Sequence, residues 1–153
     1  MSPGHPVRPL ERRHAPLVAR LRALCLAFPE ASERLSHGEP AWFAGKGKAF
    51  AMLDNHHHGA EHLAVWLPMP PGVQEELIAA DPARCFRPPY VGPAGWIGVR
   101  LDPPRADWDL VARLLREAFL HVARPRLGAR LRDGDAPAHT GRSPRGTSRP
   151  RTR

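Results

Sequence analysis

Hydrophobic residues recur with helical spacing in three stretches of the chain, and each stretch predicts an amphipathic helix. The first begins at Pro16, a residue favoured in the first turn of a helix, and ends at Pro29. The second covers residues 73–80. The third is capped by Asp107 or its neighbour and ends near Arg124. The three apolar stripes consist of Leu17, Leu21, Leu24 and Phe28; of Val73, Leu77 and Ala80; and of Trp108, Val111, Leu115, Ala118, Phe119 and Val122.

Shorter apolar or alternating segments between turn signals predict β-strands. Residues 41–44 and 49–53 flank Gly45-Lys46-Gly47-Lys48, and this arrangement is typical of a β-hairpin whose glycines supply the turn. Further strands are predicted at 62–67 and 96–101, and a short strand fits the residues around 34–37.

This order of elements predicts an α+β fold in which both long helices cover one face of an antiparallel sheet. The residues expected to face the helices are Leu63, Val65, Leu67, Ile97, Val99 and Leu101. The opposite face would then be open and lined by His62, Trp66, Trp96 and Arg100, with Lys48 as a further candidate. Aromatic and basic side chains on such a face can stack on bases and contact phosphates. We favour the alternative that a loop or a dimer partner covers the tryptophans.

Length and composition indicate one domain with two tails. The chain has 153 residues and 42% hydrophobic content, which suits a single hydrophobic core. We expect a flexible lead-in at residues 1–15, a folded domain at 16–127 and a disordered, arginine-rich tail at 128–153. Apolar runs stay shorter than the ~18 residues that span a bilayer, and the N-terminus lacks an apolar signal-peptide core. We therefore expect a cytoplasmic protein without membrane contact.

Positive charge is concentrated near the C-terminus. The net charge is +8, and residues 125–153, with eight arginines and two aspartates, account for +6 of it, which leaves +2 for residues 1–124. A basic segment of this kind suggests electrostatic contact with nucleic acid. The residues that we expect to contact phosphate are Lys46, Lys48, Arg84, Arg87, Arg100, Arg126 and Arg130.

The chemistry-bearing residues do not suggest an enzyme. Cys25 and Cys85 lie sixty positions apart without a CxxC pair, so we expect buried free thiols. Gly45-Lys46-Gly47 lacks the spacing and the following helix of a phosphate-binding P-loop. No pattern of a nucleophile with its base, or of paired catalytic carboxylates, is present.

The histidine run at positions 56–58 suggests a metal site as an alternative interpretation. Adjacent side chains diverge in extended chain, so only His56 and His58 would share a side, with His62 or His37 as a third ligand. We expect a polar turn with no metal or cofactor, and we keep His56 and His58 as the candidate ligands of the alternative.

A series of short motifs runs along about residues 17–127. The motifs are Phe28-Pro29-Glu30, His37-Gly38-Glu39-Pro40-Ala41-Trp42, Lys48-Ala49-Phe50-Ala51, Asp81-Pro82, Phe86-Arg87-Pro88-Pro89-Tyr90-Val91-Gly92, Gly95-Trp96, Arg100-Leu101 and Asp107-Trp108. In this order they resemble the MmcQ/YjbR family of small bacterial proteins. The resemblance implies a CyaY-like α+β fold, also described as a double-wing DNA-binding motif, and a DNA-binding function. The matching polar positions are His37, Lys48, Tyr90 and Arg100, with Trp42 and Trp96 as aromatic partners. The long basic tail departs from a compact family member.

Three functional hypotheses follow from these patterns. The first is a non-enzymatic DNA-binding protein of low sequence specificity, in which basic residues contact phosphate and binding falls steeply with salt. The second is a small-ligand or metal-binding module that uses the histidine turn and a cleft or open face formed by His37, Trp42, Trp66, Tyr90 and Trp96. The third is a protein-interaction domain, either a monomer or a weak homodimer, whose open sheet face buries Trp66 and Trp96.

Overall fold

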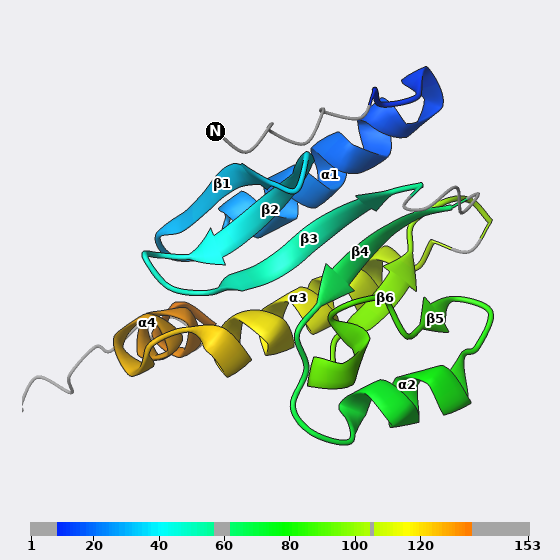
Figure 1. The fold of residues 1–153 in the computed structure, drawn as a ribbon. Coiled ribbons are helices and arrows are strands. Elements are labelled where there is room, and N and C mark those ends of the chain that lie inside the picture. The colour runs from blue at the N-terminus through cyan, green and yellow to red at the C-terminus, as the bar shows by residue number, and fades with distance from the viewer. Residues whose placement is uncertain (1–8, 57–61, 105, 136–153) are drawn as a thin grey trace, which may run out of the picture.

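The computed structural model describes residues 9–56, 62–104 and 106–135. It consists of one antiparallel sheet of six strands with helices packed against it (Figure 1). The strands are β1 (Ala31–Ser36), β2 (Glu39–Ala44), β3 (Ala49–Asn55), β4 (Leu63–Leu67), β5 (Cys85–Phe86) and β6 (Ile97–Arg100). The helices are α1 (Ala15–Leu26), α2 (Val73–Ala80), α3 (Trp108–Val122) and α4 (Pro125–Asp135), with short 3-10 turns at Arg12–His14 and Gly92–Ala94. The α+β fold expected from the sequence is confirmed.

The strand order is β1-β2-β3-β4-β6-β5, so the two-residue strand β5 forms one edge and β1 the other. Helices α1 and α3 cover one face of the sheet (Figure 1). The side chains of Leu53, Val65 and Val99 belong to the core with these helices. Strands β1 to β4 follow one another in the sheet as they do in the sequence, whereas β4 pairs with β6 and not with β5, from which α2 separates it along the chain.

Three phenylalanine rings join the first helix, the sheet and the third helix. The rings of Phe28, Phe50 and Phe119 lie with their centroids 5.0–5.3 Å apart in all three pairs. The pairing of β2 with β3 shifts register between Trp42 and Phe43, and Phe50 lies on β3 opposite this shift. The Phe50 side chain is buried in the core. Aromatic clusters of this size contribute much of the stability of a small domain.

Both boundaries of the folded domain differ from the predicted 16–127. At the N-terminus, His14 is buried, so ordered structure begins before Pro16. At the C-terminus, α4 reaches Asp135, whereas a disordered tail was predicted from residue 128. The reason is that Leu127 is buried and Leu131 lines an apolar groove with Leu24, Phe28 and Leu115. The remaining parts of the predicted lead-in and tail, residues 1–8 and 136–153, lie outside the described residues.

Both cysteines are buried free thiols, as expected. None of the helices within the described ranges is long and apolar enough to cross a membrane.

Candidate functional site

The turn between β2 and β3 presents two lysines at one end of the sheet. The backbone N–H of Gly47 donates to the carbonyl of Ala44 at 3.0 Å, and Gly45 has a φ of +60°. A left-handed residue in a tight turn favours glycine, which has no Cβ to clash. The side chains of Lys46 and Lys48 are consequently exposed on this turn.

Helix α4 lies against the same turn and adds two arginines. A Cβ atom at Gly45 would lie 3.0 Å from Leu127 Cδ1, so the turn and the helix are in contact. Arg126 and Arg130 are one helical turn apart and have side chains that are 70% and 53% exposed. We call Lys46, Lys48, Arg126 and Arg130 the basic end; Figure 1 shows the β2–β3 turn and α4 at the left of the molecule.

Glu30 lies among the cations of the basic end. Its Oε2 accepts from Arg130 Nη1 at 2.9 Å and lies 3.0 Å from Arg126 Nη2. Its backbone carbonyl also accepts from the N–H of Gly45 at 3.2 Å. One carboxylate therefore orients two guanidinium groups while the rest of their donors stay exposed.

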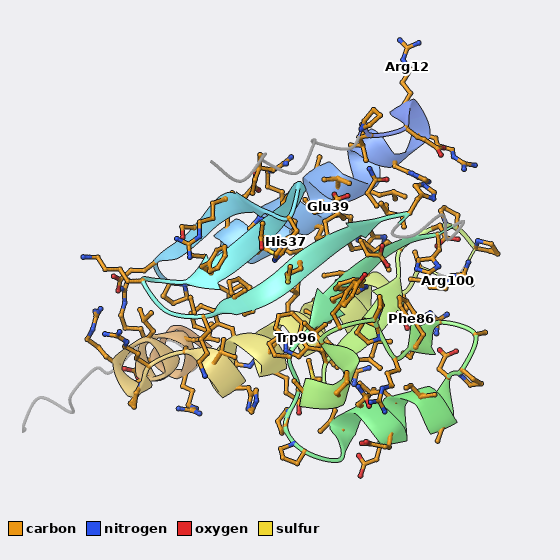
Figure 2. All side chains as sticks on the ribbon, in the orientation of Figure 1. Arg12, His37, Glu39, Phe86, Trp96 and Arg100 are labelled. Carbon is orange, nitrogen blue, oxygen red and sulfur yellow. The ribbon has the colours of Figure 1, made fainter. Side chains whose placement is uncertain are left out.

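The other three predicted phosphate contacts lie elsewhere, near the β5 edge of the sheet. Arg84 pairs with Asp81, and Arg100 Nε lies 3.5 Å from Asp102 Oδ1 (Figure 2). The aliphatic part of Arg87 packs against Gly92, where a Cβ atom would lie 2.6 Å from Arg87 Cγ. The structure thus divides the seven predicted residues into the basic end and a separate group whose members have structural partners.

The predicted cleft of His37, Trp42, Trp66, Tyr90 and Trp96 does not form. His37 is exposed in the turn between β1 and β2, whereas Trp96 adjoins β6 beyond β3 and β4 (Figure 2). Trp42 is fully buried on the helix-covered face, where its Nε1 donates to Glu33 Oε1 at 2.8 Å. Tyr90 is 72% exposed and has a φ of +62°.

Part of the sheet face expected to be open is covered by the chain itself. Trp66 is only 6% exposed, and its Nε1 donates to the buried Asp54 Oδ2 at 3.0 Å. His62 Nε2 lies 3.0 Å from the same oxygen. The ring of Phe86 packs against Gly98 and leaves no room there for a Cβ atom. Internal contacts therefore bury Trp66, which agrees with the alternative that the chain itself covers this tryptophan and not with an open face or a dimer partner.

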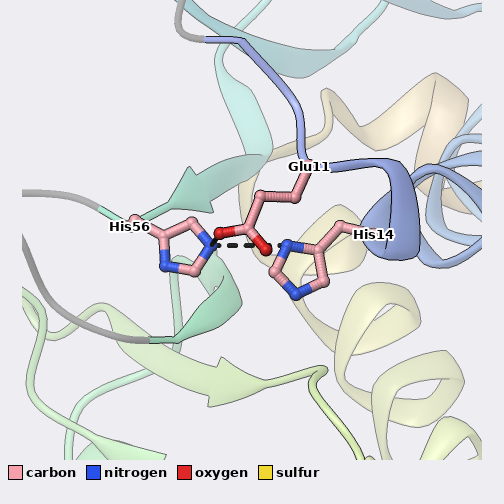
Figure 3. A group of neighbouring side chains, drawn as sticks. All are labelled: Glu11, His14 and His56. Carbon is pink, nitrogen blue, oxygen red and sulfur yellow. Dashed lines mark hydrogen bonds and ion pairs between the residues drawn. The ribbon is translucent and has the colours of Figure 1, made fainter.

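Of the histidines predicted to bind a metal with His56, His62 lies beside Asp54 and His37 lies in the turn between β1 and β2. His58 lies outside the described residues. His56 instead meets Glu11 and His14 from the N-terminal segment, with His56 Nε2 3.3 Å from His14 Nδ1 and 3.4 Å from Glu11 Oε1 (Figure 3). Burial lowers the pKa of His14, against the opposing effect of Glu11. The pKa of Glu11 is also lowered, mainly by a hydrogen bond from Arg13.

Sequence reasoning missed Glu11 and His14 because they belong to the presumed lead-in. Their approach to His56 spans more than forty positions of the chain and has no local pattern. The only sequence signal would have been the position of His14 next to a helix start, which is too common to indicate a contact.

Comparisons with known proteins identify the family. The comparison with curated proteins found no match. The crystal structure of Deinococcus radiodurans protein DR2400, which carries a DUF419 domain, has a similar fold, with a TM-score of 0.57 and 24% identity. The alignment covers 68% of this chain and 76% of that one. A family model described as YjbR matches residues 26–121, more than half of the chain, and the chain therefore belongs to the YjbR family.

Proposed function

We propose that this YjbR-family chain is a non-enzymatic DNA-binding protein that contacts the phosphate backbone through its basic end and reads little sequence. The observation that carries the proposal is the packing of Gly45 against Leu127, which brings two lysines from a hairpin turn beside two arginines from a helix. Four exposed cations from two elements give a phosphate a choice of donors that neither element supplies alone.

The exposure of these cations favours phosphate as their ligand. Ion pairs between exposed side chains contribute at most about 1 kcal/mol, so Glu30 holds Arg126 and Arg130 only weakly. A phosphate oxygen can replace the carboxylate oxygen at either guanidinium group without loss of a hydrogen bond. Long, exposed side chains of this kind position a protein on the backbone and carry no base readout, which supports low specificity.

The sequence beyond α4 extends the same charge. Five further arginines, at positions 142, 145, 149, 151 and 153, follow the helix that carries Arg126 and Arg130. They add five positive charges to the chain, which strengthens its long-range attraction for a polyanion.

The state of the thiols supports the non-enzymatic part of the proposal. Cys25 and Cys85 would be the strongest nucleophiles of the chain as thiolates. Burial raises the pKa of both thiols, that of Cys85 to about 11, so both are protonated and inert at neutral pH.

The test is fluorescence anisotropy of a labelled duplex of random sequence, titrated with the full chain at several salt concentrations. A double variant, Lys46→Gln with Lys48→Gln, should bind more weakly, and the slope of log K against log salt should fall by up to about 1.8, because each phosphate contact contributes about 0.9. The matched control is Arg12→Gln with Arg113→Gln, which removes the same charge from exposed sites outside the basic end.

Equal effects of the two double variants would mean that only net charge matters, and the assignment to the basic end would be wrong. Absence of binding by the full chain at low salt would refute the DNA-binding function itself.

A further inference from the structure

The side chains of Glu11, His14 and His56 converge from two distant parts of the chain. Glu11 precedes the 3-10 turn Arg12–His14, and His56 follows β3 with a φ of +54°. Figure 3 shows His56 Nε2 and His14 Nδ1 facing one another, with the Glu11 carboxylate beside the line that joins them. One nitrogen or oxygen atom from each residue lies within 4.8 Å of the corresponding atoms of the other two.

The spacing of these atoms matches that of ligands around a small divalent cation. Two ligands at about 2.0–2.1 Å from a tetrahedral Zn²⁺ lie about 3.3 Å apart. The two measured separations that involve His56 Nε2 are 3.3 Å to His14 Nδ1 and 3.4 Å to Glu11 Oε1. These two separations suit an ion placed between the three side chains, and the ligand atoms of Glu11 and His14 lie within 4.8 Å of one another.

The chemistry of the three groups also favours a transition-metal cation over Ca²⁺ or Mg²⁺. Two imidazole nitrogens and one carboxylate oxygen form a set that suits Zn²⁺, whereas the alkaline-earth ions prefer oxygen ligands alone. Without an ion, one of the two facing nitrogens must carry a proton to make a hydrogen bond to the other. A cation can accept lone pairs from both nitrogens at once.

We propose that Glu11, His14 and His56 bind one Zn²⁺ ion, with a fourth position left for water or a further ligand. The ion would join the segment before α1 to the end of β3. This site is independent of the DNA-binding proposal, since the basic end contains none of its residues.

The experiment is isothermal titration of the full chain, without a polyhistidine tag, with zinc chloride. We expect one ion per chain. Glu11→Gln and His14→Gln should each weaken Zn²⁺ binding by at least about tenfold. Loss of a residue that only hydrogen-bonds to a metal ligand already weakens binding by about that factor, and loss of a ligand should cost no less. His121→Gln, at an exposed histidine on α3, is the matched control and should leave the affinity unchanged. A Co²⁺ absorption spectrum of the wild type should show tetrahedral coordination that Glu11→Gln removes.

Two results would overturn the proposal. One is the absence of stoichiometric Zn²⁺ binding by the wild type. The other is binding that survives Glu11→Gln and His14→Gln but is lost in His57→Ala with His58→Ala, because the adjacent histidines alone would then hold the ion. The Glu11 side chain is 47% exposed, so Glu11→Gln keeps the test valid even if His14→Gln impairs folding. Circular dichroism of each variant checks that the fold is retained.

Discussion

Gly45 packs so closely against Leu127 that a Cβ atom at position 45 would lie 3.0 Å from Leu127 Cδ1. Gly45 also has a φ of +60°, a conformation that costs other residues about 1–2 kcal/mol. We therefore predict that Gly45→Ala lowers the free energy of unfolding by at least about 1 kcal/mol. It should also weaken duplex binding, because the lysine turn must move away from the arginines of α4.

Gly72→Ala separates these two effects. Gly72 has a φ of +88°, but among the described residues no atom beyond its chain neighbours lies within 4 Å of a Cβ atom at that position. The variant should lose stability in urea denaturation through backbone strain alone and should bind duplex DNA like the wild type. If Gly72→Ala weakens binding as much as Gly45→Ala does, the loss reflects stability and not the position of the turn.

The indole hydrogen bonds of Trp66 and Trp42 should contribute differently to the free energy of unfolding. Trp66 donates to Asp54, whose side chain is 2% exposed, whereas Trp42 donates to Glu33, which is 28% exposed and also paired with Arg22. Trp66→Phe should cost about 1–3 kcal/mol of unfolding free energy beyond the lost volume, because a buried acceptor loses a donor. Trp42→Phe should lose little beyond volume, because water reaches Glu33. Urea denaturation of both variants measures the difference, and equal losses would argue against a stabilising role for Asp54.

The buried thiol of Cys85 should make the protein less stable in alkali. Burial and, secondarily, Asp81 raise its pKa to about 11, while Arg84 acts in the opposite direction. A raised pKa in the folded state means that stability is complete below the pKa of the unfolded thiol, near 9, and is lost as pH rises toward 11. The free energy of unfolding, measured by denaturation between pH 8 and pH 11, should therefore decline with pH. The decline should be smaller in Cys85→Ala. An unchanged decline in that variant would assign the effect to other groups.

Removal of the Glu30 carboxylate should strengthen DNA binding. Glu30→Gln leaves Arg126 and Arg130 without their anionic partner and raises the charge of the basic end by one. We predict an affinity increase of about two- to fivefold at low salt, because an exposed ion pair is worth less than about 1 kcal/mol. Glu75→Gln, at an exposed position on α2, is the control for net charge. Weaker binding by Glu30→Gln would show that the orientation of the arginines matters more than their charge.

Helices and long strands were predictable because their signals are local. The second predicted helix has the bounds of α2, and the Asp107 side chain accepts from the Leu110 N–H at 3.1 Å, as expected of a helix cap. The two-residue strand β5 is too short to show an alternating pattern. Helix α4 has only two leucines among its arginines, and it is ordered by the neighbouring core and not by its own periodicity.

The candidate sites depended on contacts between distant segments, which a single sequence does not reveal. Lys46 and Lys48 could be identified from their turn, but their proximity to Arg126 depends on how α4 packs. The burial of Trp66 depends on the pairing of β4 with β6, which places Gly98 opposite it, and on its hydrogen bond to Asp54. The meeting of His14 with His56 depends on the position of the N-terminal segment, for which the sequence has no signal.

The most direct test of the DNA-binding account compares two full-length variants that lose the same charge. One carries Lys46→Gln, Lys48→Gln, Arg126→Gln and Arg130→Gln, and the other carries Arg142→Gln, Arg145→Gln, Arg149→Gln and Arg151→Gln. Duplex affinity is measured by anisotropy across a salt series. We predict that the first variant loses most of the salt slope and the affinity, while the second keeps the larger part of both. The reverse order would contradict the account, because the C-terminal arginines and not the folded domain would then hold the DNA.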